Sequence, residues 1–158
     1  MSVAFTKEQD AESAAADLPD RPVSSHPNLV TAQGLAALDA ALAAARAAYS
    51  TAKAGANVQA DRTPIARATR DLRYYASRRA SAQLMVTESG DIVRFGARIT
   101  FDREDGRRQA YRIVGEDEAD PNAGTISYIS PLAQALLGKA VGDTVIVSGA
   151  EIEIISIA

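Results

Sequence analysis

The stretch "TAQGLAALDAALAAARAAY" spans residues 31–49, and its apolar residues are spaced alternately three and four apart. This spacing is typical of the seam of a coiled coil, and Thr31 is a plausible N-cap. The seam positions are Leu35, Leu38, Leu42, Ala45 and Tyr49. The pattern fades near Lys53, and the glycine and asparagine at residues 55–57 indicate a turn. The sequence therefore predicts one long helix followed by a reversal of the chain.

A second segment with the same spacing begins at Thr63, which we expect to be the N-cap, with Pro64 at the first helical position. Its seam positions are Ile65, Ala68, Leu72, Tyr75, Arg79 and Ala82. Two helices with matching seams and a short connection predict an antiparallel coiled-coil hairpin over residues 31–83, with arms of about 30 Å. Helices packed flat on a globular body would show a wider apolar face.

Residues 84–158 carry the alternating pattern of β-strands. Strands are expected at residues 93–101, with an interruption at Gly96, and at 111–114, 126–129, 145–147 and 152–157. Asp105 and Gly106 indicate a hairpin turn. A short helix should begin at Pro131 with Ser130 as N-cap, and end at Gly138. This segment predicts a small antiparallel sheet with one helix, so the fold class is α+β.

Charge is distributed unevenly along the chain, which has a net charge of −3. Residues 1–30 hold two basic and five acidic side chains together with three prolines, and we expect a disordered or loosely docked arm. The hairpin holds eight basic and three acidic side chains, against seven and twelve in residues 84–158. A basic hairpin on an acidic body suggests that the hairpin meets a negative partner. Alternatively, its arginines only solvate an alanine-rich helix face.

The composition excludes several classes of protein. There is no cysteine, so no disulfide framework or thiolate nucleophile is possible. His26 is the single histidine, which makes a histidine metal site improbable. No apolar run approaches the ~20 residues that span a bilayer, and the acidic N-terminus does not resemble a signal peptide. We expect a cytoplasmic protein without a membrane association.

The C-terminal motifs resemble those of the bacterial Gre transcript-cleavage factors, GreA and GreB. The stretches that carry the resemblance are "NLVTAQGLAAL" (28–38), "VRFGARITF" (93–101), "YRIVGEDEADP" (111–121), "ISPLAQALLGKAVGD" (129–143) and "EIEII" (151–155). The leader "LPDRPVSSHPNLVT" (18–31) is more similar to the GreB side of the family.

The resemblance implies a hairpin that enters the secondary channel of RNA polymerase and a C-terminal domain of FKBP-like fold that binds the channel's rim. Ser127, Ser130 and Pro131 lie where the family presents its polymerase-facing surface. In active members two acids at the hairpin tip help to hold the second Mg²⁺ for hydrolysis of backtracked RNA. That ion belongs to the polymerase active site, so no cofactor of the chain's own is expected. Nascent or backtracked RNA in the channel is a further expected partner.

The hairpin tip departs from the family pattern. Asp61 is the only acid among residues 50–67, with Lys53 and Arg62 nearby, and the arms look shorter by more than one turn each. A Mg²⁺ site built on one carboxylate is poorly placed for catalysis. We therefore predict a regulator that occupies the channel as a plug or competitor without stimulating cleavage, and that is not itself an enzyme.

Other interpretations of the sequence stay open. The chain could be an active cleavage-stimulating factor that uses Asp61, or, from another class, an FKBP-like prolyl isomerase. The acidic run Glu116, Asp117, Glu118 and Asp120 could be a metal cluster, although solvated surface is the expected role. Lys139 follows a glycine, but no glycine-rich strand–loop–helix accompanies it, so a phosphate-binding loop is not predicted.

Overall fold

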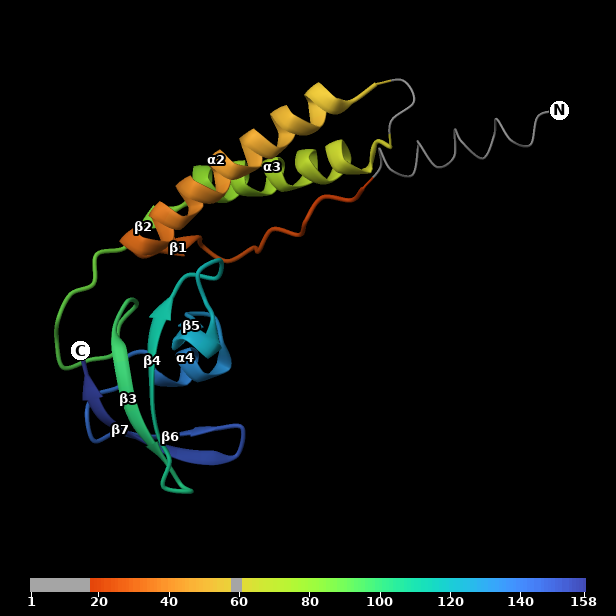
Figure 1. The fold of residues 1–158 in the computed structure, drawn as a ribbon. Coiled ribbons are helices and arrows are strands. Elements are labelled where there is room, and N and C mark those ends of the chain that lie inside the picture. Colours follow the sequence, from red (N-terminus) through yellow and green to blue (C-terminus); the bar gives the residue numbers. More distant parts are fainter. Residues whose placement is uncertain (1–17, 58–60) are drawn as a thin grey trace. The chain divides into compact units, whose positions relative to one another are not determined.

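The computed structural model describes residues 18–57 and 61–158, and the chain divides into two compact units (Figure 1). The first unit contains residues 38–81 and the N-terminal segment that ends at His26. The second contains residues 27–37 and 82–158. The boundary at 37/38 lies inside a helix, so the first turns of that helix belong to the second unit. The first 17 residues of the expected N-terminal arm lie outside the described residues.

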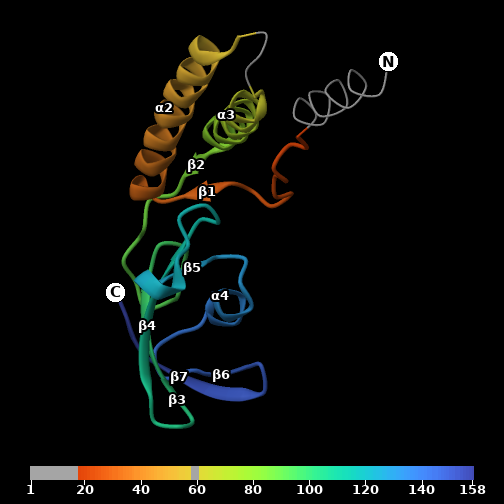
Figure 2. The ribbon, with the colours of Figure 1, turned by 45° about the vertical axis from the view of Figure 1, so that its right-hand side comes forward.

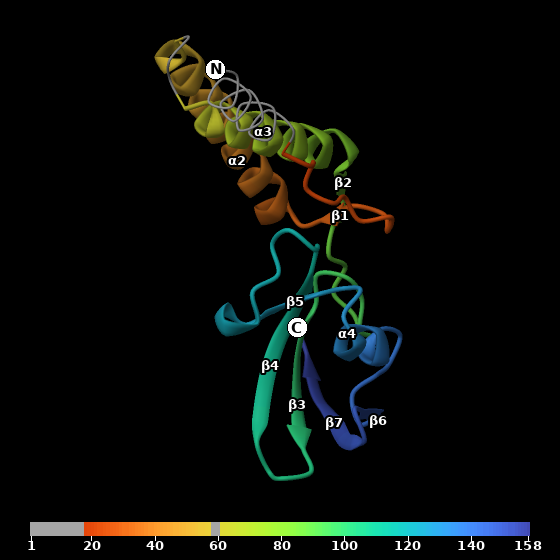
Figure 3. The same ribbon diagram turned by 90° about the vertical axis from the view of Figure 1, so that its right-hand side faces the viewer.

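Helices α2 (Ala32–Gly55) and α3 (Thr63–Ser81) form a hairpin whose arms run side by side in opposite directions (Figures 1 and 3). Figure 2 looks almost along α3 while α2 lies across the view, so the two helices cross at an angle. The seam residues Leu38, Leu42 and Ala45 are buried, as is Ala68 on α3. None of them belongs to the core cluster of the sheet domain. The predicted helical hairpin is therefore confirmed.

A short parallel strand pair joins the two ends of the hairpin. Strand β1 (Leu29–Val30) precedes α2, and β2 (Gln83–Leu84) follows α3. The Gln83 amide donates to the Asn28 carbonyl at 2.8 Å, and the Met85 amide donates to the Val30 carbonyl at 2.9 Å. The sequence did not predict this pair, because strands of two residues are too short for a period-two pattern.

The C-terminal domain is built on five strands in the order β5-β4-β3-β7-β6 (Figure 3). They are β3 (Arg98–Arg103), β4 (Arg108–Val114), β5 (Thr125–Ser127), β6 (Thr144–Val147) and β7 (Ala150–Ile157). All neighbours pair antiparallel except β4 and β5, which pair parallel. The fully antiparallel sheet expected from the sequence is therefore wrong at this pair. The connection through the 3₁₀ turn η1 (Pro121–Ala123) brings the chain back in the same direction.

The local signals for turns and for the short helix agree with the structure. Gly106 has φ +82° in the turn between β3 and β4, where the Asp105 carboxylate accepts the Arg107 amide at 3.0 Å. Helix α4 (Pro131–Leu136) begins at the predicted proline. Strand β3, which was predicted to begin at residue 93, begins at Arg98, because Gly96 adopts φ +86° and interrupts the extended segment.

The core of the domain lies between the sheet and α4. Its buried members are Val93, Ala97, Ile99, Phe101, Ile113, Ile126, Ala133, Leu136, Val145, Ile152 and Ile154. Alternate residues of β3 and β7 point inward, and α4 contributes Ala133 and Leu136. Burial of this apolar cluster supplies the domain's main stabilisation. None of the helices in the described part of the chain is long and apolar enough to cross a membrane.

Candidate functional site

The one carboxylate at the hairpin tip caps helix α3. Asp61 Oδ1 accepts hydrogen bonds from the Thr63 backbone N–H at 2.9 Å and from Thr63 Oγ1 at 2.7 Å. These two bonds lower the pKa of Asp61 below its ordinary value, with a smaller contribution from the charge of Arg67. The helix begins at Thr63 itself, so the prediction that Thr63 is the N-cap is wrong. Asp61 is thus an exposed, ionised carboxylate with one oxygen already engaged.

The other charges near the tip are positive. Lys53 lies exposed in the last turn of α2, and Arg62 is exposed beside Asp61. The next acid along the chain is Asp71, about 12 Å along the axis from the start of α3. Its Oδ1 lies 3.6 Å from Arg21 Nη1 and 3.5 Å from Arg70 Nε. The described part of the tip therefore offers a single carboxylate, and the second acid is engaged by arginines.

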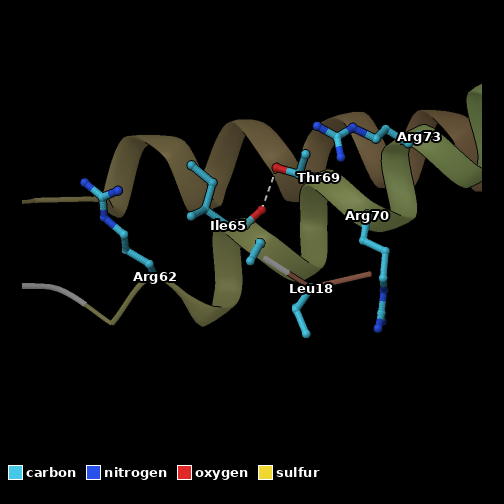
Figure 4. A pocket seen from close by; sticks show the side chains of 7 residues that line it. Leu18, Arg62, Ile65, Thr69, Arg70 and Arg73 are labelled. Atoms are coloured by element: carbon cyan, nitrogen blue, oxygen red, sulfur yellow. Dashed lines mark hydrogen bonds between the residues drawn. The ribbon is translucent and has the colours of Figure 1, made fainter. Parts of the chain in front are cut away.

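A hollow of about 210 Å³ lies along the same helix (Figure 4). Its lining residues are Leu18, Arg62, Ile65, Ala66, Thr69, Arg70 and Arg73. Leu18, Ile65 and Ala66 are its apolar lining residues, and the Thr69 hydroxyl donates within the helix to the Ile65 carbonyl at 2.7 Å. The arginines at 62, 70 and 73 recur on one helix face, which gives this part of the hairpin a positive rim. Such a face can meet the phosphates of a nucleic acid.

The leader segment is held against α3 by specific contacts. The guanidinium carbon of Arg21 lies 3.9 Å from the ring centroid of Tyr74 and 5.3 Å from that of Tyr75. Arg73 Nη1 lies 3.3 Å from Asp20 Oδ1. These contacts were not predicted, because an arginine that stacks on an aromatic ring far along the chain leaves no periodic signal. Residues 18–26 of the leader are thus part of the hairpin unit.

The expected polymerase-facing residues come together in one turn between β5 and α4. Ser130 is the N-cap of α4, and its hydroxyl accepts the Ala133 amide at 3.3 Å. The Ser127 hydroxyl accepts the Ile129 amide at 3.3 Å, and Pro131 is exposed at the first helical position. The structure therefore places Ser127, Ser130 and Pro131 within five residues where β5 ends and α4 begins, with Pro131 exposed and both serines half-buried; their role in binding stays a prediction.

The acidic run at residues 116–120 has a structural role that the sequence did not predict. Glu118 is partly buried, and its two oxygens accept the Thr31 N–H at 3.1 Å and the Thr31 hydroxyl at 2.5 Å. Asp120 caps η1 by accepting the Asn122 amide at 3.1 Å. The expectation of a solvated surface is therefore wrong for Glu118. Across the described residues, no group of three or more histidine or acidic side chains is placed to hold a metal ion.

Comparison with known proteins gives matches that concentrate in the C-terminal domain. Residues 88–158 match the family described as "Transcription elongation factor, GreA/GreB, C-term". The chain is 47% identical over 77 residues to the transcription elongation factor GreA of Desulfovibrio desulfuricans, a match that covers 47% of this chain and 48% of that protein. It is 52% identical over 71 residues to GreA of an Anaeromyxobacter species, covering 43% of each chain. The matches thus span less than half the length of these curated relatives.

Solved structures give more extended matches at lower identity. GreA factor homolog 1 of Thermus thermophilus is 20% identical, with a TM-score of 0.40, and the match covers 84% of this chain and 99% of that one. A GreA/GreB elongation factor of Nitrosomonas europaea is 16% identical, with a TM-score of 0.38, covering 82% and 98%.

Proposed function

We propose that this chain regulates transcription by binding RNA polymerase at the secondary channel. The proposal rests on the match of residues 88–158 to the GreA/GreB family of transcription elongation factors. In this proposal the C-terminal domain binds the polymerase and the hairpin enters the channel. The hairpin acts there as a plug or competitor and does not stimulate RNA cleavage.

The observation that carries the proposal is the state of Asp61. The family match lies in the C-terminal domain, whereas the chemistry of cleavage would depend on the tip. There, the one carboxylate has an oxygen engaged by Thr63 and an arginine as its sequence neighbour. In active members of the family two acids at the tip help to hold the second Mg²⁺, whereas this tip offers one carboxylate whose Oδ1 is already engaged by Thr63. The neighbouring Arg62 repels a cation by Coulomb energy of about 1 kcal/mol or less at an exposed site.

The positive face of α3 supports a role inside a channel that contains RNA. Arg62, Arg70 and Arg73 rim the hollow on this helix. Arginine forks pair well with phosphate groups, so this face fits nascent or backtracked RNA if the phosphates replace Asp20 and Asp71 as partners of Arg73 and Arg70. The chain needs no cofactor of its own in this scheme, since the catalytic Mg²⁺ belongs to the polymerase.

Two other functions are less well supported. An active cleavage factor would have to use Asp61 alone, through a carboxylate whose Oδ1 is already engaged by Thr63. A prolyl isomerase would need an aromatic-lined apolar pocket. In the described C-terminal domain, Phe101 is fully buried and Tyr111 stacks on it at 6.1 Å between centroids. Phe95 and Tyr128 also pack against the core.

A pull-down with the cognate RNA polymerase tests the binding half of the proposal. The double variant Ser127→Ala/Pro131→Ala should weaken capture of the polymerase by the full chain, because both changes alter the turn from β5 into α4. The control Asp61→Ala alters only the tip and should leave capture unchanged. Full capture by the double variant, or none by the unaltered chain, would contradict this assignment.

A further inference from the structure

Thr31, the N-cap of α2, is hydrogen-bonded to the side chain of Glu118, 87 residues away in the sequence. The Thr31 hydroxyl accepts the Gly34 amide at 3.0 Å, as an N-cap residue does. The Glu118 carboxylate then accepts both the Thr31 N–H and the Thr31 hydroxyl, at 3.1 and 2.5 Å. Thr31 is 1% exposed, so these bonds lie away from solvent.

This arrangement is a capping box divided between two segments. In an ordinary capping box, the N-cap hydroxyl binds the backbone N–H of the third helical residue, whose own Glu or Gln accepts the N-cap N–H. Here the third helical residue is Gly34, which has no side chain, and the carboxylate comes from Glu118. The negative charge also lies at the positive end of the helix dipole.

Two glycines make room for the contact. A Cβ on Gly34 would lie 1.9 Å from Glu118 Oε2, and its three nearest atoms all belong to Glu118. A Cβ on Gly115 would lie 2.2 Å from the Leu29 carbonyl oxygen. Both distances are far shorter than real contacts. A side chain at position 115 would therefore displace the backbone of Leu29, whereas one at position 34 would displace the Glu118 carboxylate. Because Gly34 has no side chain, the Glu118 carboxylate can lie next to the first turn of α2.

Other contacts hold the same segment on the C-terminal domain. The Tyr128 hydroxyl donates to the Pro27 carbonyl at 2.5 Å, and Arg112 Nη1 donates to the Gln33 side chain. Val30 is 3% exposed beside them. The first turn of α2 thus belongs to the C-terminal domain, while the rest of the helix forms the hairpin.

We propose that Glu118 is a positioning residue that fixes the first turn of α2 on the C-terminal domain. Its carboxylate has two roles: it completes the cap of α2, and it holds residues 27–31 against the loop that contains Glu118. The consequence for transcription rests on the proposed function, because the domain that binds the polymerase would then also hold the base of the hairpin.

The two tasks can be separated by moving the carboxylate. Glu118→Ala removes both the cap and the fastening. In Gly34→Glu/Glu118→Ala the new glutamate occupies the space that Glu118 left and completes an ordinary capping box within α2. The double variant should therefore restore the cap without restoring the fastening.

The experiment uses NMR on the free full-length chain and its two variants. Glu118→Ala should speed exchange of the Thr31 amide by roughly tenfold to a hundredfold, as expected when a bond to a charged acceptor is lost. The double variant should return this exchange to the rate of the unaltered chain. The order parameters of amides 28–31 should stay below the values of the unaltered chain in both variants, because the bond from Glu118 is lost while the other contacts of the segment remain.

Two results would overturn the proposal. If the double variant also restores the order parameters, Glu118 is only a helix cap. If Glu118→Ala changes neither quantity, the contact has no role in solution. A third variant, Gly34→Ala, controls for misfolding. In the unaltered chain it should have the same effect as Glu118→Ala, because its Cβ displaces the carboxylate. Added to Glu118→Ala, it should cause no further loss. Because these measurements need no polymerase, failure of the proposed function would appear separately, as loss of polymerase capture by the unaltered chain.

Discussion

Replacing Arg21 by alanine should loosen the leader from the hairpin. The Arg21 guanidinium carbon lies 3.9 Å from the Tyr74 ring centroid, and one of its nitrogens lies 3.6 Å from Asp71. A hydrogen bond with Tyr75 raises the pKa of Arg21 above its ordinary value, so the group is charged at any accessible pH. The substitution removes the stacking and the ion pair in one step.

The expected loss follows from the exposure of these groups. A cation–π contact at a partly exposed site contributes about 0.5–1 kcal/mol. The Arg21 and Asp71 side chains are 36% and 39% exposed, so solvent screens the ion pair to about 0.2–1 kcal/mol. Arg21→Ala should therefore lower the unfolding free energy of the hairpin by about 1–2 kcal/mol. Arg21→Lys keeps the charge but loses the planar group that stacks, and should fall in between.

Urea unfolding followed by circular dichroism at 222 nm measures this change, because α2 and α3 provide most of the helical signal. With an m-value of about 1–3 kcal/mol/M, the midpoint should fall by roughly 0.3–2 M. Arg46→Ala, which removes an exposed arginine from α2, is the matched control for charge. A midpoint that does not move, or that moves equally in Arg46→Ala, would refute the assignment of the leader to the hairpin.

Two further predictions concern the tip and the core. The capping bonds from Thr63 hold the pKa of Asp61 in the folded chain below its unfolded value of about 3.9. The stability from this cap is present above the unfolded pKa and is lost as the pH falls through the lower, folded-state pKa. The Thr63 amide resonance should stay constant from pH 7 to 5 and shift below about pH 4, and a shift centred near neutral pH would contradict the cap. Phe101→Ala, at a residue with 0% exposure, should lower the unfolding free energy of the C-terminal domain by about 3–5 kcal/mol in thermal or urea unfolding; a loss under 1 kcal/mol would place Phe101 outside the core.

The sequence predicted those elements whose signals are local. The seam through Leu38 and Leu42, the turn at Gly106 and the cap at Ser130 each depend on residues a few positions apart. The structure confirms the hairpin, the turn and the short helix for that reason. The single acid at the tip is likewise readable from the sequence, although its capping bonds to Thr63 are not.

The features that the sequence did not predict depend on distant residues. Glu118 and Thr31 meet only in the folded chain, and the sole local hint is Gly34 at the position where a capping box would place an acid. The parallel pairing of β5 depends on how the connection through η1 runs. Arg21 finds Tyr74 because the leader runs along α3. Periodicity within one segment cannot report such contacts.

The central claim is that this chain can occupy the polymerase channel without supporting RNA cleavage. The most direct measurement is hydrolysis of RNA in backtracked complexes of the cognate polymerase at neutral pH, with and without the protein, and with an authentic GreA added. We predict little or no cleavage by the protein alone, and slower GreA-driven cleavage when it is present in excess. Robust cleavage by the protein alone that disappears in Asp61→Ala would contradict the account.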